Sequence, residues 1–454
     1  MTDCAPLEAL RRKVATKTAR IGIFGAGYVG LPLACAFAEA GFKTVAGDSD
    51  AEKVLAIRKG SSYVEDEYVL RCIRDLVRSK MLEAENDMAR LASIVDFAII
   101  TVPTPLNDRK EPDLSCVIKV TEDIAREIRP GRFVILESTV YPGATDEVLK
   151  PILERSGLHA GVDFGLAHSP ERIDYNNKRY SILKIPKVVG GVTPLCTKIA
   201  SELYAKVLQA PVVPVSSARV AEASKMLENV YRYVNIALVN ELAILHEKMG
   251  LDIFEVIAAA STKPFGFQPF YPGPGVGGHC IPKDPYYLAY KARQVGESLR
   301  LVESSTEIND GMVNHIIVRL ETKLASLGRS TRGSKAVLLG LAFKADASDS
   351  RKSPSITFAE RLTDLGMEVT AYDPLVRSVP TNKGTLSSAE DLEKSAKNSE
   401  ILILVTPHTV FKAIDLKKLA ANMRPGAVVV DTRGFWSPAE CESAGFSYLG
   451  LGRP

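Results

Sequence analysis

The residues with the clearest capacity for chemistry lie in one glycine-rich segment, FYPGPGVGGHCIPKDPYYL, residues 270–288. Cys280 is followed within one helical turn by a cation, Lys283, and a carboxylate, Asp284. A thiol becomes a nucleophile when nearby groups favour its thiolate or take its proton. The preceding glycines leave room for a substrate and supply backbone N–H groups that can bind an anion; they are Gly273, Gly275, Gly277 and Gly278. The segment indicates an activated cysteine beside a substrate site.

Two other interpretations of this segment stay open. An inert, buried cysteine is the ordinary alternative to a nucleophile. Cys35, Cys72 and Cys196 lie in apolar or helical contexts typical of that structural role. A dyad of Cys280 with His279 is disfavoured, because adjacent side chains on a chain are expected to diverge.

A second pair of candidate residues lies in a stretch with helical spacing. Lys225 and Asn229 are four residues apart, so they share one helix face. A solvated face is the usual explanation for such a pair. A lysine and an asparagine that converge on one oxygen would instead stabilise a developing oxyanion.

A nucleotide site is indicated by Gly25, Gly27 and Gly30, which form G-x-G-x-x-G between an apolar run and a helical stretch. The first glycine permits a tight turn, the second lets a pyrophosphate approach the backbone, and the third lets helix and strand pack closely. Asp48 ends the next apolar run at about the expected 20-residue offset, where its carboxylate can accept both ribose hydroxyls of NAD. The pattern predicts NAD as the cofactor; NADP and a fold without nucleotide are the alternatives.

Two further segments follow apolar runs that read as strands. They are residues 103–105, which include Thr104, and residues 137–139, which end at Thr139. Open α/β sheets bind ligands at the carboxyl ends of their strands, so both segments are candidates for that edge. Ordinary turn chemistry is the alternative for each residue taken singly.

The elements that must position these residues repeat in order at the two ends of the chain. ARIGIFGAG, a helix and KTVAGD are answered after residue 335 by KAVLLGLAF, a helix and EVTAYD. DFAIITVPTP and PGRFVILEST are answered by EILILVTPH and PGAVVVDTR. Near-continuous apolar strands alternating with helices predict parallel sheets covered on both faces. We therefore expect an α/β protein with two Rossmann-like, doubly wound domains.

The middle of the chain predicts a different, helical domain. Residues 217–250 contain no Pro, and no Gly until their end, so they predict one helix of roughly 50 Å. Its apolar residues exceed one narrow stripe, which predicts burial on several sides and a homodimer or higher homo-oligomer through this helix. The expected domains are residues 1–213, a helical domain with the cysteine loop at 214–325, and residues 326–454.

Composition excludes several classes of protein. The 454 residues include 57 Lys+Arg and 54 Asp+Glu, a net charge of +3 that argues against a dedicated nucleic-acid binder. The 7 cysteines include no CxxC pair, so neither a disulfide framework nor a metal site is expected. No apolar run reaches the ~20 residues that span a bilayer, and the N-terminus lacks a signal-peptide core. We expect a cytoplasmic protein without a membrane partner.

An NAD fingerprint, a cysteine nucleophile, an oxyanion clamp and a second Rossmann-like half together resemble the UDP-glucose/GDP-mannose dehydrogenase family. The resemblance covers about residues 18–440, and GGHCIPKD is its most specific run. It implies oxidation of the 6-hydroxymethyl group of a nucleotide sugar to a carboxylate with two NAD and no metal. Cys280 would form a thiohemiacetal and then a thioester that water hydrolyses. The C-terminal half would hold the nucleoside diphosphate.

The resemblance also implies roles for single residues. Lys225 and Asn229 would stabilise the oxyanion, and Asp284 would order water and move protons with Thr139 as its neighbour. Glu171 would act in the hydrolytic half. The implied substrate-binding residues are Glu171, Arg172, Lys225, Asn229, Phe270, Tyr271, Gly277, Lys283, Lys344 and Arg433. The implied cofactor-binding residues are Gly25, Gly27, Tyr28, Val29, Gly30, Asp48, Thr104, Thr139 and Arg351.

Two positions narrow the expected substrate. Tyr175 stands where members that oxidise UDP-glucose carry a second glutamate, and Lys263–Pro264 stand where they carry a loop arginine. We expect UDP-N-acetylglucosamine, with UDP-N-acetylmannosamine next and UDP- or TDP-glucose third. A cysteine-dependent acyl transferase and a binding module without chemistry are more distant alternatives; the fingerprint with Asp48 and the intact nucleophile argue against them.

Overall fold

The computed structural model describes residues 5–173 and 180–454. The chain forms two compact units, each described by itself below. Unit 1 comprises Met1–Glu228 and Tyr286–Glu297, and unit 2 comprises Asn229–Pro285 and Ser298–Pro454. The division into three domains stays a prediction. Within the described ranges, no helix has both the length and the apolar character needed to cross a membrane.

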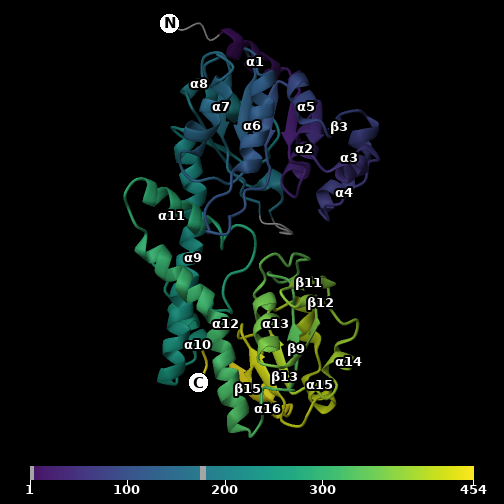
Figure 1. Ribbon diagram of the computed structural model, residues 1–454, viewed down its shortest axis with the longest axis vertical. Coiled ribbons are helices and arrows are strands. Elements are labelled where there is room, and N and C mark those ends of the chain that lie inside the picture. The colour runs from purple at the N-terminus through teal and green to yellow at the C-terminus, as the bar shows by residue number, and fades with distance from the viewer. Residues whose placement is uncertain (1–4, 174–179) are drawn as a thin grey trace. The chain divides into compact units, whose positions relative to one another are not determined.

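Unit 1 is built on an eight-stranded sheet (Figure 1). Its first six strands are parallel and have the order 3-2-1-4-5-6 of dinucleotide-binding folds, and β7 then pairs antiparallel with β6. In spatial order the strands are β3 (Leu82–Glu85), β2 (Thr44–Gly47), β1 (Ile21–Phe24), β4 (Phe97–Ile100), β5 (Phe133–Leu136), β6 (Gly165–His168), β7 (Lys187–Gly191) and β8 (Val212–Pro214). The predicted doubly wound sheet is confirmed.

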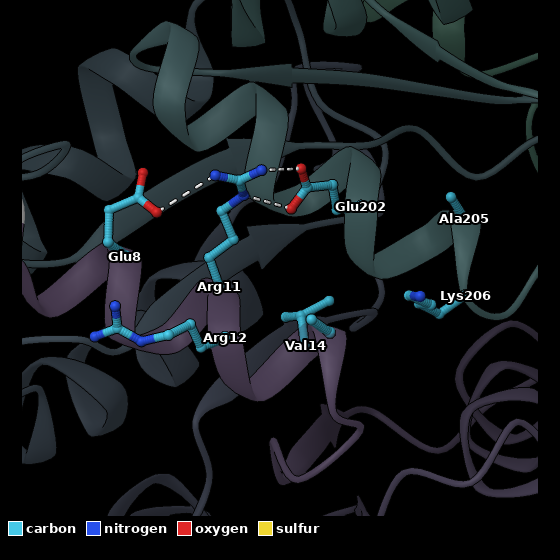
Figure 2. Close-up of a pocket in the computed structure, with 8 residues that line it drawn as sticks. Glu8, Arg11, Arg12, Val14, Glu202, Ala205 and Lys206 are labelled. Atoms are coloured by element: carbon cyan, nitrogen blue, oxygen red, sulfur yellow. Dashed lines mark hydrogen bonds and ion pairs between the residues drawn. The ribbon is translucent and has the colours of Figure 1, made fainter.

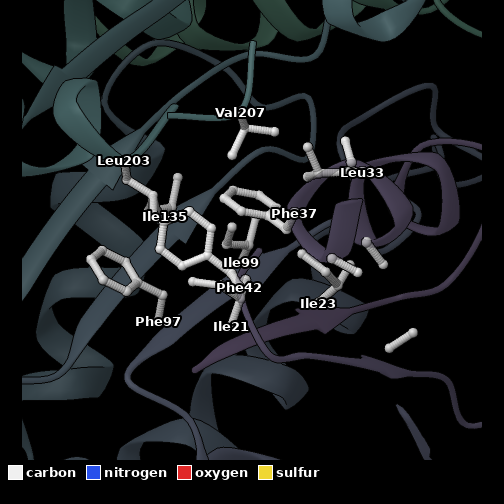
Figure 3. Packing of buried hydrophobic residues seen from close by; sticks show 14 of the residues in the cluster. Ile21, Ile23, Leu33, Phe37, Phe42, Phe97, Ile99, Ile135, Leu203 and Val207 are labelled. Atoms are coloured by element: carbon white, nitrogen blue, oxygen red, sulfur yellow. The ribbon is translucent and has the colours of Figure 1, made fainter. Parts of the chain in front are cut away.

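Apolar side chains cover both faces of this sheet. Successive side chains of a strand point to opposite faces, so neighbouring residues join different clusters. Ile21 and Ile23 join one apolar cluster and Phe24 joins the other. Figure 3 shows Phe37 of α2 packed near Ile23 and Ile99 of the strands. The helices of this unit are α1 (Ala5–Ala15), α2 (Gly30–Glu39), α3 (Ala51–Arg58), α4 (Glu67–Arg78), α5 (Met88–Ile94), α6 (Ser115–Glu127), the π-turn η1 (Thr145–Leu149), α7 (Lys150–Glu154), the short η2 (Ile182–Lys184) and α8 (Pro194–Ala205).

The first helix is fastened to α8 across a surface pocket of about 440 Å³ (Figure 2). Arg11 and Glu202 form a bidentate pair, with Nε–Oε2 2.7 Å and Nη2–Oε1 2.8 Å. Leu7, Leu10 and Val14 are buried beneath it. A half-exposed ion pair contributes about 1 kcal/mol or less, so apolar burial holds α1 and the pair fixes its register on α8.

Unit 2 contains the second parallel sheet, with the order β10-β9-β13-β14-β15. The repeated motifs at the two ends of the chain therefore form matching strands, and Asp373 follows β10 as Asp48 follows β2. The strands are β9 (Lys335–Leu339), β10 (Glu368–Tyr372), β13 (Ile401–Leu404), β14 (Val428–Asp431) and β15 (Ser447–Gly450), with a separate hairpin of β11 (Ser378–Thr381) and β12 (Gly384–Ser387).

The predicted long helix is confirmed as α9, Ala218–Met249, whose 32 residues extend about 48 Å. Its first residues belong to unit 1 and its later ones to unit 2. The remaining helices are α10 (Ile253–Ala260), α11 (Asp284–Gln294), α12 (Arg300–Ser326), α13 (Pro354–Asp364), α14 (Leu392–Ala396), η3 (Thr409–Ala413), α15 (Leu416–Asn422) and α16 (Pro438–Ser443).

Candidate functional site

The glycine turn of unit 1 has the geometry that the spacing predicts. Gly25 has φ +104, and a Cβ on Gly30 would lie 2.0 Å from the carbonyl oxygen of Gly25. A Cβ on Gly27 would meet nothing within 4 Å, so open space lies beside the backbone at that position. Val29 precedes α2 and makes no side-chain hydrogen bond to its first turn. An uncapped helix start beside open space fits the pyrophosphate of a dinucleotide.

Two residues that the sequence did not indicate hold this turn in place. Thr101 follows β4, and its Oγ1 donates to the carbonyl oxygens of Gly25 at 2.8 Å and Phe24 at 3.2 Å. Tyr63 donates from its hydroxyl to the carbonyl oxygen of Ala26, between the first two glycines. These bonds fix a turn whose glycines would otherwise be conformationally free.

Asp48 follows β2 and is buried, as expected for the ribose-binding carboxylate. Its Oδ1 accepts from the Asp50 amide at 3.0 Å, and its Oδ2 lies 3.4 Å from Lys53 Nζ. Lys53 is a second finding that the sequence did not indicate, and it lies in the first turn of α3. It places a cation beside the carboxylate that is predicted to discriminate against a 2′-phosphate.

Thr104 and Thr139 are both buried in unit 1, each shortly after a strand end. Tyr287 donates to the carbonyl oxygen of Thr104 at 2.7 Å, and Ser138 Oγ donates to the carbonyl oxygen of Val102 at 2.7 Å. Tyr28 is exposed after the second glycine. The structure thus places these segments at the carboxyl edge of the sheet.

Lys225 lies in α9 and is buried against the partly buried Glu171 of the SPER run. Its Nζ lies 2.5 Å from the Glu171 carbonyl oxygen and 3.3 Å from Oε2. Arg172 pairs with Glu228, with Nη2–Oε1 2.7 Å, and donates to the Pro186 carbonyl oxygen. Glu171 is therefore held by Lys225, and Arg172 is held by Glu228; both partners lie in α9.

His168, at the end of β6, is a further residue that the sequence did not indicate. Its ring is fully buried, and Nδ1 has no hydrogen-bond partner among the described residues. Burial, together with the positive charges of Lys225 and Lys187, lowers the pKa of His168 to about 3. The imidazole is therefore neutral at physiological pH.

A second, partly buried lysine lies in the same unit, beside the buried Glu137. Lys187 Nζ lies 2.6 Å from Glu137 Oε2, and the Tyr204 hydroxyl donates to the other oxygen of that carboxylate. Burial and then the charge of Glu137 raise the pKa of Tyr204. Glu137 thus has a structural role beneath the edge that carries Thr139.

Glu222, one turn before Lys225, anchors the segment that follows Thr139. Its carboxylate accepts from the Gly143 amide at 2.5 Å, from the Thr145 amide at 2.8 Å and from Thr145 Oγ1 at 2.6 Å. Burial, with a smaller contribution from the charge of Asp146, raises the pKa of Glu222 to about 7 against the effect of these bonds. This carboxyl group titrates near neutrality.

We expect Glu222→Gln to change the pH dependence of thermal stability. Because the folded-state pKa is raised from 4.5 to about 7, the folded chain holds the proton more tightly than the unfolded chain. The stabilising contribution is complete below pH 4.5 and is lost as the pH rises through about 7. The Tm of the parent protein relative to that of the glutamine variant should therefore be higher at pH 5 than at pH 8.

Differential scanning calorimetry at both pH values measures this difference. Glu67→Gln, at an exposed position of α4, is the matched control and should leave the pH dependence unchanged. A Tm difference between parent and Glu222→Gln that is the same at both pH values would contradict the assignment.

In unit 2, Cys280 immediately precedes the turn that opens α11. Its carbonyl oxygen accepts from the Lys283 amide at 3.0 Å and the Asp284 amide at 2.9 Å. Asp284 is buried, and its Oδ2 accepts from Asn229 Nδ2 at 2.5 Å. Two of the predicted catalytic residues are thus joined directly, and Cys280 lies in the turn that leads into α11.

The expected divergence of Cys280 and His279 is wrong in this geometry. Cys280 Sγ lies 3.9 Å from His279 Nδ1, within hydrogen-bond distance for sulfur. The backbone here is a bend and not a regular strand or helix, so adjacent side chains can turn towards each other. Of the other described cysteines, Cys116 is exposed, whereas Cys35, Cys72, Cys196 and Cys441 are buried.

The glycines of the cysteine loop allow close approach to the segment that carries Lys344. A Cβ on Gly277 would lie 2.8 Å from Phe343 Cβ, and one on Gly278 would lie 2.9 Å from Phe343 Cε2. Gly278 also donates its amide to the Arg351 carbonyl oxygen at 3.1 Å. The structure therefore brings the loop of Cys280 together with the predicted Lys344 segment.

Arg433 approaches the same loop from the end of β14. A Cβ on Gly273 would lie 2.2 Å from Arg433 Nη1, and Arg433 Nε donates to the Val405 carbonyl oxygen at 3.2 Å. Burial lowers the pKa of Arg433 to about 10, although Asp431 opposes this. The guanidinium remains charged at neutral pH.

The remaining predicted residues have varied surroundings. Arg351 binds Asp349 with Nη2–Oδ2 2.6 Å, and its role towards a cofactor stays a prediction. Phe270 packs edge-on against Tyr231, and Tyr271 is exposed and stacks on Phe254. The others are Lys283, which is buried, Lys263, whose Nζ lies 5.1 Å from the Phe265 ring, and Tyr175, which lies outside the described residues.

Three sequence profiles of one family match consecutive parts of the chain. They describe the NAD binding domain, the central domain and the UDP binding domain of the UDP-glucose/GDP-mannose dehydrogenase family, at residues 19–208, 219–311 and 337–438. The chain belongs to this family. It is an NAD-dependent oxidoreductase of the UDP-sugar dehydrogenase class, with NAD as its cofactor.

Several proteins are similar to this chain over most of its length. UDP-N-acetyl-D-glucosamine 6-dehydrogenase of Pseudomonas aeruginosa is 38% identical over 363 residues, 79% of this chain and 84% of that protein. The structure of UDP-D-ManNAc dehydrogenase from Pyrococcus horikoshii has a TM-score of 0.88 and 31% identity, covering 96% and 99% of the two chains. NDP-N-acetyl-D-galactosaminuronic acid dehydrogenase of Methanosarcina mazei has a TM-score of 0.85 and 32% identity over 99% and 98%.

For this dehydrogenase, Asp48→Ser should reduce the preference for NAD over NADP. Removing the carboxylate removes both the repulsion of a 2′-phosphate and the acceptor of the ribose hydroxyls, an effect of about 1–3 kcal/mol. Lys53 then remains as a cation at the same place. The ratio of kcat/KM for the two cofactors should shift by roughly 5- to 150-fold.

Adding Lys53→Ala to the Asp48→Ser variant provides the control. The double variant should lose much of the gain in kcat/KM for NADP, because no cation replaces the lost carboxylate. An unchanged cofactor ratio in Asp48→Ser would refute the role given to this carboxylate.

Proposed function

We propose that the protein oxidises the 6-hydroxymethyl group of a UDP-N-acetylhexosamine to a carboxylate through a covalent adduct on Cys280. The observation that carries the proposal is the placement of Cys280 before α11, beside a buried Asp284 bound to Asn229. Family membership supports the NAD-dependent oxidation of a UDP-sugar. Acyl transfer without NAD has no support from these relatives.

The proposed reaction has two oxidations and one hydrolysis. The C6 hydroxyl loses a proton and C6 loses a hydride, which gives an aldehyde. Gly25, Gly27 and Gly30 would hold NAD, which would supply the hydride acceptor for each oxidation. The Cys280 thiolate adds to the aldehyde carbon, and the former aldehyde oxygen takes a proton, which gives a thiohemiacetal.

The second oxidation removes that proton and a hydride from the thiohemiacetal, which leaves a thioester. Water adds to the thioester carbonyl and the C–S bond breaks, releasing the carboxylate and the thiol. Lys225 and Asn229 stabilise the oxyanion in these steps. Asp284 orders water and moves protons, and Glu171 holds Lys225 and acts in the hydrolysis.

The proposed substrate is UDP-N-acetylglucosamine. The P. aeruginosa relative carries that substrate in its name, whereas the P. horikoshii structure is of a UDP-D-ManNAc enzyme, so the mannosamine epimer is the second candidate. Lys263–Pro264 and Tyr175 support an N-acetylhexosamine over UDP- or TDP-glucose. We assign Lys344, Arg433, Arg172, Lys283, Phe270, Tyr271 and Gly277 to substrate binding, and Arg351 to the cofactor.

A panel of nucleotide sugars tests this proposal. Initial rates of NADH formation at saturating NAD should be highest with one of the two UDP-N-acetylhexosamines. A pocket group that binds the acetamido substituent is left unpaired by UDP-glucose, which should lower kcat/KM by roughly 5- to 150-fold. Two NADH should form per acid. Faster oxidation of UDP- or TDP-glucose would reject the substrate, and one NADH per aldehyde would reject the second oxidation.

We also propose that the chain forms a homodimer or a higher homo-oligomer through α9. Tyr231, Leu238 and Leu245 are 47, 50 and 49% exposed and recur every seven residues on one helix face. Tyr231 and Leu238 also line a groove of about 550 Å³. Light scattering should give a dimeric mass or more for the parent and a lower mass for Leu238→Lys. A monomeric parent would exclude this interface.

A further inference from the structure

Loop 340–353 of unit 2 joins β9 to α13 and carries Lys344 and Arg351. The proposed function assigns the first to the nucleotide sugar and the second to the cofactor, and the following inference rests on that assignment. Neither residue is fixed by regular secondary structure, so other contacts must hold the loop in one form.

Asp373 is the first of these contacts. Its side chain is fully buried after β10, and Oδ2 accepts from the amides of Leu341 at 2.6 Å and Ala342 at 3.0 Å. Its Oδ1 accepts from the amides of Leu375 at 2.8 Å and Val376 at 2.7 Å. Burial opposes ionisation, but the bonds from His408 and these amides outweigh it and lower the pKa of Asp373 to about 2.

His408 joins Asp373 to the outer part of the loop. It is fully buried after β13, with Nε2 3.0 Å from Asp373 Oδ2, and Nδ1 accepts from the Asp346 amide at 3.0 Å. Because Nδ1 accepts, the proton lies on Nε2 and is donated to the carboxylate. The ring also packs edge-on against Phe411, with centroids 5.3 Å apart.

Asp346 is held by its side chain as well as by its amide. Its Oδ1 accepts from the Thr409 amide at 2.8 Å and its Oδ2 from Thr409 Oγ1 at 2.5 Å. Asp346 has φ +57, a left-handed conformation that needs support from its surroundings in a residue other than glycine. His408 and Thr409 thus fix the loop at Asp346, two positions from Lys344.

The equivalent carboxylate of unit 1 has a different environment. Asp48 accepts from one backbone amide and lies beside one lysine, which leaves it able to bind a ribose. Asp373 is at the same strand-end position but is occupied by four amides and one imidazole. In unit 2 Asp373 therefore holds the surrounding backbone in place, and its oxygens are not available to bind a ribose.

We propose that His408 is a positioning residue for nucleotide-sugar binding, which joins Asp373 to Asp346 and holds loop 340–353 in the form that presents Lys344. A ligand that binds only this form has an apparent affinity reduced by the fraction of molecules that adopt it. Loss of the bridge should therefore weaken nucleotide binding.

The test compares His408→Phe, which keeps a ring but makes neither bond, with His408→Gln, whose amide offers one donor and one acceptor. UDP is the probe in isothermal titration calorimetry. We expect the phenylalanine variant to bind UDP at least about tenfold more weakly and the glutamine variant to stay within about threefold of the parent. KM for the nucleotide sugar should rise together with the UDP Kd.

Hydrogen exchange of the unliganded proteins gives a readout that is independent of activity. The amides of 341–353 should exchange faster in His408→Phe than in the parent and in His408→Gln. Asp346→Gly is a second variant that should fold, because the position is exposed and its φ suits glycine. It should weaken UDP binding in the same direction as His408→Phe.

Several outcomes would overturn the positioning role. Unchanged UDP affinity or unchanged exchange in both His408→Phe and Asp346→Gly would do so, as would a loss of UDP affinity in His408→Gln equal to that in His408→Phe. If the parent oxidises no nucleotide sugar, the proposed function fails, and the exchange data still decide whether His408 orders the loop.

Discussion

Replacing Cys280 by serine should abolish steady-state formation of the acid, with kcat lowered by at least about 10³-fold. A serine hydroxyl is a far weaker nucleophile than a thiolate at neutral pH, and an ester hydrolyses more slowly than a thioester. A thiol ionises far more readily than an alcohol, so serine at this position offers little of the corresponding anion. NADH formation and the mass of the product measure the effect.

Cys116→Ser is the matched control, because Cys116 is an exposed cysteine in α6 of unit 1. It should retain the parental kcat. Near-parental acid formation by Cys280→Ser would exclude the covalent route, whereas accumulation of aldehyde in that variant would place the block at the second oxidation.

The second large effect is expected for Lys225→Met. The ammonium of Lys225 is buried and held by Glu171, so it can face a developing oxyanion without reorganising. Removing one donor of this kind lowers kcat by about 10²- to 10³-fold. KM for the nucleotide sugar should change much less, because the interaction strengthens in the transition state. Steady-state kinetics with the preferred UDP-sugar separate the two constants.

Lys187→Met controls for the loss of a buried lysine. Lys187 pairs with Glu137 as Lys225 pairs with Glu171, and both pairs belong to unit 1. Breaking a buried pair costs about 3–5 kcal/mol of stability, so this variant should lose thermal stability. At a temperature where both variants are folded, its kcat should exceed that of Lys225→Met by an order of magnitude or more. Equal losses of kcat would remove Lys225 from the chemistry.

The parts of the fold and site that could be predicted from the sequence are those that local geometry determines. A turn between a strand and a helix needs a positive φ at Gly25 and close packing at Gly30, and both are visible as spacing. Runs of apolar residues predict strands buried on both faces, and the absence of Pro and Gly predicts α9. Asp48 could be predicted because it ends an apolar run, and the end of a strand is recognisable in the sequence without any tertiary contact.

The rest depends on contacts between residues far apart in the chain. Tyr63 reaches Ala26 across 37 residues and His408 reaches Asp373 across 35, and no periodicity encodes such a partner. The neutral state of His168 depends on burial between two lysines from other elements. The geometry of His279 and Cys280 was misjudged because a general rule for adjacent side chains does not hold in a bend.

Because four other cysteines are buried, a reagent that alkylates thiols can be directed to Cys280. Cys35, Cys72, Cys196 and Cys441 are shielded in the native state, and burial raises the pKa of Cys441 to about 12. If Cys116 and Cys4, which lies outside the described residues, are replaced by serine, Cys280 becomes the thiol open to an alkylating reagent. A fluorophore or spin label could then be attached at this single position, and the rate of its attachment would report the ionisation of the thiol in the working enzyme.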